Sequence, residues 1–285
     1  MKVGKRIHVI GAWDAETVQL QVEMQKWRNF SQYTDIEALL CILSNKELKA
    51  NCLRNVDDLK EQSYLQPLID NDEALPFVAC FDHGNEESIS LWKMYAGHNY
   101  GIKLQLNLPD DSKSLCSTLL EKYKPVKGCR PGYKPVLLSQ FQFENKEYEF
   151  PKVFVQTTAN PITYKNSLQN PSYQLPASNL INISTLAAVK STAWSFQNEA
   201  RIVAFLEHVG HTATNDEVEP VDIPAFEYLL LPICFNRLES IEITFSPWMG
   251  EETKRMVREK VDGLKLDCKC ILFRDSSLTG TIRIK

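Results

Sequence analysis

Short apolar runs of strand length, separated by helical segments and long polar loops, constrain the fold of this chain most. Residues 75–81, 101–108, 200–206 and 239–245 are too short for ordinary helices but suit single strands. Helical periodicity appears between such runs, as in residues 250–264. The chain contains no series of regular βαβ units, so the pattern predicts an α+β fold.

A chain of 285 residues can form one large domain, and we expect a single domain over residues 1–285. Residues 1–30 are expected to form an N-terminal helical extension, because helical periodicity runs through residues 14–30. Residues 109–160 are mostly polar, basic and interrupted by Pro and Gly, which predicts an insertion or mobile lobe.

Several function classes are disfavoured by what the sequence lacks. No apolar run approaches the roughly 18 residues of a membrane-spanning helix, and the start does not resemble a signal peptide. We therefore expect a cytoplasmic protein with reduced cysteines, no membrane partner and no metal site, since Cys268 and Cys270 have no companion ligands. Motifs for Rossmann, P-loop, HExxH and GxSxG chemistry are absent.

A basic segment at residues 121–134 interleaves lysines and arginine with two tyrosines. Such a segment suits phosphate contacts and base stacking, although an exposed loop explains it more simply. The net charge of −4 argues against extensive nucleic-acid binding.

The segment "SFQNEARIVAFL" (195–206) places Gln197, Glu199 and Arg201 at period two, at the start of an expected strand. At this spacing the three side chains are expected on one face of the sheet. An exposed Glu199–Arg201 pair of little energetic value is the simpler interpretation. A catalytic carboxylate with positioning neighbours is the alternative.

Three aromatic residues, Tyr33, Trp92 and Tyr95, form a second group of candidate site residues. Tyr33 ends a short strand, directly before a helix expected over residues 34–48, with Thr34 and Glu37 at capping-box spacing. Trp92 and Tyr95 share one face of the next helix, where core packing is the simpler role for Trp92.

Four segments together resemble the bacterial "domain of unknown function 2971" family: residues 33–48, residues 77–81 with "LWKMYAGHNYGIKLQL" (91–106), "AWSFQNEARI" (193–202), and residues 241–256. Their order agrees with that family over about residues 30–285, outside 109–160. Gln197 departs from it, since the family usually has a glutamate there.

The same features are similar to ADP-ribosyltransferases of the DarT type and their relatives, which implies an ADP-ribosyltransferase-like sheet core and NAD as the substrate. The resemblance implies that Glu199, Tyr33 and Tyr95 are catalytic. Their expected partners in binding NAD are Arg54, Trp92, His98, Gln197 and Arg201. A carboxylate beside the ribose would stabilise the oxocarbenium-like transition state.

The leading hypothesis is thus an intracellular effector that cleaves the nicotinamide–ribose bond and modifies a protein or nucleic acid, in phage defence or as a toxin, with a regulatory partner protein possible. A non-catalytic module that senses a nucleotide or a phage component is one alternative. A nucleic-acid-binding or nuclease-like effector that uses residues 121–134 is another.

Overall fold

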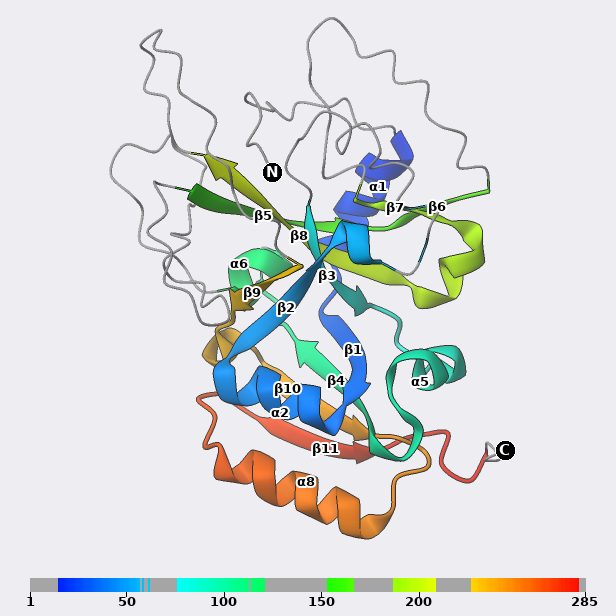
Figure 1. The fold of residues 1–285 in the computed structure, drawn as a ribbon, viewed down its shortest axis with the longest axis vertical. Helices are drawn as coiled ribbons and strands as arrows, with labels where there is room; N and C mark the ends of the chain where they lie inside the picture. Colours follow the sequence, from blue (N-terminus) through cyan, green and yellow to red (C-terminus); the bar gives the residue numbers. More distant parts are fainter. Residues whose placement is uncertain are drawn as a thin grey trace, which may run out of the picture.

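The computed structural model describes residues 15–56, 58, 61, 76–112, 114–120, 153–166, 187–208 and 227–281. These residues form a large mixed sheet, a small two-stranded sheet and a few helices, which confirms the α+β class (Figure 1).

The large sheet has nine strands and is mostly antiparallel. Seven of them lie in the order β11-β10-β4-β1-β3-β2-β9, and β8 pairs with both β3 and β5. Only β10 and β11 pair in parallel, joined through helix α8. The strands are β1 (Asn29–Asp35), β2 (Glu47–Cys52), β3 (Phe77–Asp82), β4 (Gly101–Asn107), β5 (Val153–Pro161), β8 (Glu199–His208), β9 (Tyr228–Pro232), β10 (Ser240–Phe245) and β11 (Ile271–Asp275). The small parallel sheet pairs β6 (Thr163–Lys165) with β7 (Val189–Ser191).

The sheet splits at β3. On one side, β3 pairs with β8 along its whole length. On its other side it pairs with β2 at Phe77 and Val78 and with β1 at Asp82. Among the described strands, residues 79–81 therefore have no strand partner on that side, and β1 and β2 diverge around them (Figure 1).

Five α-helices are described: α1 (Ala15–Met24), α2 (Ile36–Asn45), α5 (Ile89–Tyr95), α6 (Leu115–Leu119) and α8 (Glu251–Gly263). Short 3-10 turns η1 (Leu53–Asn55), η2 (His98–Tyr100), η4 (Thr192–Gln197) and η5 (Phe235–Arg237) connect other elements. Helix α2 links β1 to β2 across the split, and α8 lies beside β11 at the lower end of the view (Figure 1). None of the described helices is long and apolar enough to span a membrane.

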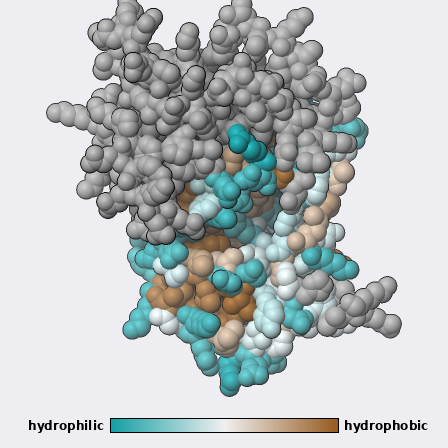
Figure 2. All heavy atoms as spheres, in the orientation of Figure 1, coloured by the Kyte–Doolittle hydropathy of each residue, from teal (hydrophilic) through white to brown (hydrophobic). Residues whose placement is uncertain are grey.

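The hydrophobic core lies against one face of the sheet. Alternate residues of β4 and β10, among them Ile102, Leu104 and Ile243, are almost fully buried there. Leu39 and Leu43 of α2 contribute to the same core. Figure 2 shows apolar surface in the region where α2 lies in Figure 1, whereas the surface below it, at α8, is mostly hydrophilic. The alternation leaves the opposite face of the central strands free for polar residues.

Three expectations about local structure were wrong. The strand β5 occupies residues 153–161, so the end of the expected lobe at 109–160 belongs to the main sheet, and residues 115–119 form α6. Residues 121–152, with the basic segment, lie outside the described residues. The later half of residues 180–194 has a sequence that predicts a helix, but its described part instead forms β7 and the start of the 3-10 turn η4. The expected helix over 34–48 ends at Asn45, and β2 begins two residues later.

The helix α2 also begins differently from the expectation. Thr34 belongs to β1, and Asp35 is the N-cap, whose Oδ1 accepts a 2.8 Å hydrogen bond from the Ala38 amide. The sequence predicts an apolar face of Ile36, Leu39, Leu40 and Leu43; Ile36, Leu39 and Leu43 are buried, and Leu40 is half-buried. Residues 1–14 of the expected N-terminal extension lie outside the described residues, and α1 covers part of the remainder.

The cap can be tested by substitution. We expect Asp35→Ala to lower the free energy of unfolding by about 1 kcal/mol, because an orphan amide of the first turn loses its acceptor. Asp35→Asn retains the acceptor and should lose only a fraction of that value. Denaturant unfolding would measure both variants. A loss with Thr34→Ala that exceeds the loss with Asp35→Ala would contradict this assignment of the cap.

Candidate functional site

A pocket of about 730 Å³ lies at the split in the sheet, within the usual size range of small-molecule sites. Strand residues line it, mostly at alternate positions: Ser31, Tyr33 and Asp35 of β1, Glu47, Lys49 and Asn51 of β2, Val78, Cys80 and Asp82 of β3, and Glu199 and Arg201 of β8. Gln32 and Thr34 of β1, Phe81 of β3 and Leu230 of β9 also belong to the lining. Residues of α2, Tyr95 of α5, and Lys190, Trp194 and Gln197 complete the wall. The split thus turns the polar face of the sheet into a pocket.

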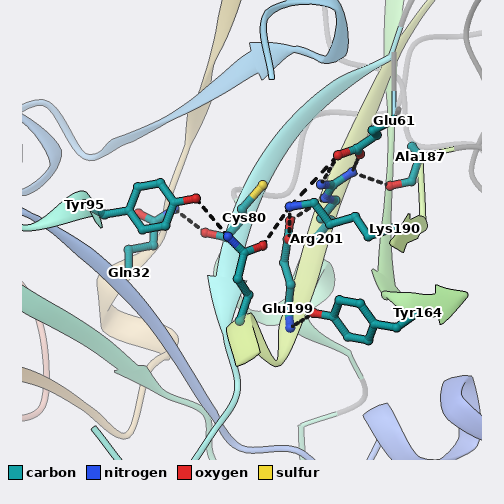
Figure 3. A network of polar contacts seen from close by, with 10 residues as sticks. Gln32, Glu61, Cys80, Tyr95, Tyr164, Ala187, Lys190, Glu199 and Arg201 are labelled. Carbon is teal, nitrogen blue, oxygen red and sulfur yellow. Dashed lines mark hydrogen bonds and ion pairs between the residues drawn. The ribbon is translucent and has the colours of Figure 1, made fainter. Parts of the chain in front are cut away.

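Lys190, Glu199 and Arg201 of the lining form a buried charged cluster with Glu61, which lies behind them (Figure 3). Arg201 is 0% exposed and lies between two carboxylates. Its Nε donates to Glu199 Oε1 at 2.5 Å, and its terminal nitrogens donate to both Glu61 oxygens. Lys190 Nζ donates to Glu199 Oε2 at 2.7 Å. The cluster carries two positive and two negative charges, so it is neutral as a whole.

The cluster was only partly predictable. Glu199 and Arg201 do share one face of β8, as expected, but the pair is buried rather than exposed. Glu61 and Lys190 were not predicted: Glu61 is 140 residues from Arg201 along the chain, and Lys190, only nine residues before Glu199, belongs to no motif. The carbonyl of Ala187 also accepts from Arg201 at 2.8 Å.

The charge state of Glu199 follows from these contacts. Burial alone raises the pKa of its carboxyl, but the Arg201 guanidinium and the Lys190 ammonium outweigh that effect and hold the pKa at about 2. Glu199 is therefore a fixed carboxylate at neutral pH. A carboxylate has about four acceptor positions, so one from Arg201 and one from Lys190 leave capacity for a ligand hydroxyl.

Gln197 links this cluster to the pocket wall. Its Oε1 accepts from Lys190 Nζ at 2.7 Å, and its Nε2 donates to the Tyr95 hydroxyl at 2.8 Å. Gln197 ends a 3-10 turn, and Asn198 adopts a left-handed conformation (φ 41°), so these residues are not the extended segment that was expected. Gln197 nonetheless lies beside Glu199, because both accept from the same ammonium group.

Tyr33 lies at the other side of the pocket. Its hydroxyl accepts a 3.0 Å hydrogen bond from the Ser88 amide, and Lys103 Nζ lies 5.7 Å from its ring centre. Burial is the main cause that raises the pKa of Tyr33, so the hydroxyl keeps its proton at neutral pH. Tyr33, Tyr95 and Glu199 all line this one pocket.

Of the other predicted site residues, Arg201 lines the pocket, whereas Trp92 and Arg54 do not. Trp92 is 0% exposed, packs edge-on against Tyr33 and donates through its indole to Glu87 at 2.9 Å, which is a core role. Arg54 is exposed on η1 and does not line the pocket. His98 lies on η2, and its side chain is outside the described part of the structure. Arg201 has its donors directed to protein acceptors rather than to the pocket.

Asp82 is a second carboxylate of the pocket that sequence reasoning missed. It is 7% exposed, and its Oδ1 accepts from the Gly84 amide at 2.8 Å. Within the described residues its Oδ2 has no hydrogen-bond partner. Burial raises the pKa of Asp82 to about 6, against weaker opposing effects from Gly84 and Lys103.

Comparison with known proteins gave no assignment: no family model, curated protein or solved structure matches this chain. Within the described residues no group of three or more His, Cys, Asp or Glu side chains is placed to hold a metal ion. The lining contains six carboxylates (Asp35, Glu37, Glu47, Asp58, Asp82 and Glu199) and three cations (Lys49, Lys190 and Arg201), so it is acidic.

Because Arg201 is the centre of the buried cluster, its substitution should destabilise the folded protein strongly. Arg201→Met should lower the free energy of unfolding by about 3–5 kcal/mol, because Glu61 and Glu199 would remain buried with one cation between them. Arg274→Met is the matched control, since Arg274 pairs with Glu242 at the surface and should contribute less than about 1 kcal/mol. Urea unfolding of both variants tests this, and equal losses would contradict it.

The raised pKa of Asp82 should make the free energy of unfolding depend on pH. Its pKa rises from an ordinary value of 3.8 to about 6 on folding, so the folded protein binds more protons between these values. Stability therefore falls as pH rises through this window and stays lower above it. We expect Asp82→Asn to raise the free energy of unfolding by about 1–3 kcal/mol at pH 7.5 and to change it little near pH 4. Asp111→Asn, in an exposed turn, is the control, and a gain that is equal at both pH values would rule out this cause.

Proposed function

We propose that this chain binds NAD in the pocket and cleaves the nicotinamide–ribose bond, passing ADP-ribose to a macromolecular acceptor or to water. The observation that carries the proposal is the convergence of Glu199, Tyr33 and Tyr95 on one pocket. These residues come from β8, β1 and α5, and their sequence positions alone gave no reason for them to meet.

The state of Glu199 suits this reaction. Cleavage of the bond places positive charge on the ribose as neutral nicotinamide leaves. A carboxylate that is ionised and already oriented stabilises that charge without reorganisation during the reaction. Arg201 and Lys190 fix Glu199 in this way, and Gln197 holds Lys190 in turn.

The aromatic and cationic residues suit the two ends of NAD. Tyr95 is 40% exposed and presents a ring near the Glu199 end, where a pyridinium group would also meet the carboxylates. Lys49 lies on β2, across the split from β1, and is an exposed cation on the lining. It replaces Arg54 as the candidate partner of the diphosphate.

The test is nicotinamide release from NAD by the purified protein, with and without cell lysate. We expect Glu199→Gln to lower the rate by about 10²–10³, because a preorganised charge that acts on the transition state is lost. Glu259→Gln, on the exposed side of α8, should leave the rate unchanged. Dependence of the rate on lysate would distinguish transfer from hydrolysis. The absence of both nicotinamide release and NAD binding in calorimetry would refute the proposal.

A second function is favoured by the acidic lining: a non-catalytic module that binds a cationic organic ligand. Six carboxylates with Tyr95 and Trp194 form a setting that attracts cations. The same lining disfavours the phosphate backbone of a nucleic acid in this pocket. Calorimetry with NAD, ADP-ribose and simple organic cations would separate the two functions, since a sensor of this type binds the cations and retains binding in Glu199→Gln.

A further inference from the structure

The pocket contains two carboxylates in opposite environments. Asp82 and Glu199 are register partners on β3 and β8, so their side chains lie on the same face of the sheet with Cα atoms roughly 4.5–5.5 Å apart. Glu199 accepts hydrogen bonds from two cationic side chains. Asp82 accepts one from a backbone amide and keeps one oxygen without a partner among the described residues.

The unpartnered oxygen of Asp82 requires an explanation. Its side chain is more than nine-tenths buried, and buried polar atoms normally have hydrogen-bond partners. Asp82 also lines the pocket, but its Oδ2 is itself shielded from solvent, so a bound molecule reaches this oxygen only when the carboxylate turns toward the pocket. An acceptor that is buried, free and adjacent to a pocket is suited to a ligand that donates a hydrogen bond.

The surrounding residues hold Asp82 in place. Gly84 lies two residues after Asp82, and a Cβ atom there would lie 2.9 Å from Asp82 Oδ1 and 3.2 Å from the side-chain nitrogen Nδ2 of Asn198. Asp82 also pairs with Ser31 of β1, at the one position where β1 and β3 meet. The carboxylate is thereby fixed at the junction of three strands, next to Glu199.

The charged and titratable groups around Asp82 come from four elements. Lys103 of β4 acts on it electrostatically. The Asp82 carboxylate in turn contributes to the raised pKa of Tyr33 on β1 and of Tyr164 on β6. Glu199 of β8 is its register partner. Lys103 has no carboxylate within salt-bridge distance in the described part of the chain, so Asp82 lacks the two-cation clamp that Glu199 has.

We propose that Asp82 is the proton acceptor for the group that attacks the ribose, an inference that rests on the proposed function. The oxygen of water or of an acceptor hydroxyl forms a bond to the ribosyl carbon. The carbon–nitrogen bond breaks, and its electron pair leaves with neutral nicotinamide. The attacking oxygen loses its proton to Asp82 Oδ2, and Asp82 later releases that proton to solvent. Glu199 stabilises the ribose while Asp82 activates the nucleophile, a division of roles that two carboxylates in different environments can perform.

The test is the rate of nicotinamide release between pH 5 and 8.5 for the wild type, Asp82→Asn and Glu86→Gln. The wild-type rate should rise through about pH 6, where Asp82 ionises, and then reach a plateau. Asp82→Asn should lose about 10²-fold in kcat at pH 7.5, with KM nearly unchanged and with this rise absent. Glu86→Gln removes the same charge from an exposed residue outside the pocket and should behave like the wild type.

A second variant separates chemistry from structure. Asp82→Ala with added formate should recover part of the lost rate, because a small carboxylate can occupy the vacated space, and a purely structural role would give no recovery. An Asp82→Asn rate within threefold of the wild type, or an unchanged pH profile, overturns the inference and leaves the proposed function in place. A wild-type protein that neither releases nicotinamide nor binds NAD overturns both.

Discussion

The site depends on the buried ion pairs of Arg201 with Glu61 and Glu199. A fully buried guanidinium is tolerable only because Glu61, Glu199 and the Ala187 carbonyl receive its donors. These groups lie up to 140 residues from Arg201 along the chain. The cluster therefore connects β8 with Glu61 and with Ala187, two residues before β7, and it also fixes the position of Glu199.

The split in the sheet provides the space that this cluster faces. In a continuous sheet a strand would pair with the open edge of β3, and Cys80 and Asp82 would lie beside side chains of that strand. Instead α2 leads the chain away after Asp35 and returns it as β2 at the other end of β3. Fold and site are thus linked: the same divergence that interrupts the pairing of β3 opens the pocket.

Much of the fold was predictable from local patterns, because strands and helices depend on nearby residues. The periodicity around Leu39 and Leu43 located the core face of α2, and the apolar run near residue 200 located β8. The strand β2 was missed because its sequence, ELKANC, continues a helix-like pattern, and β7 was missed because Ala187 and Ala188 suit a helix. In both regions tertiary pairing outweighed local preference.

The site was less predictable, because its members meet only through the sheet register. Gln197 and Glu199 gave a signal through their spacing, whereas Asp82 became visible only as the register partner of Glu199. Lys190 and Glu61 gave no signal, because each is a single charged residue in an ordinary polar segment. Trp92 was predicted as a site residue, but it packs against Tyr33 from the core. A tryptophan in the core and a tryptophan that contacts a ligand cannot be distinguished from the sequence alone.

The middle of β3 has no strand partner on the side of the split among the described residues. The carbonyl of Cys80 points into the split and accepts a 2.9 Å hydrogen bond from the Gln32 side chain, where a neighbouring strand would otherwise provide a backbone amide. One part of the pocket is therefore made by the main chain, which every residue at position 80 would supply. Substitution of the lining side chains would alter the charge and shape of the pocket, but this polar edge would persist for as long as the strand itself is formed.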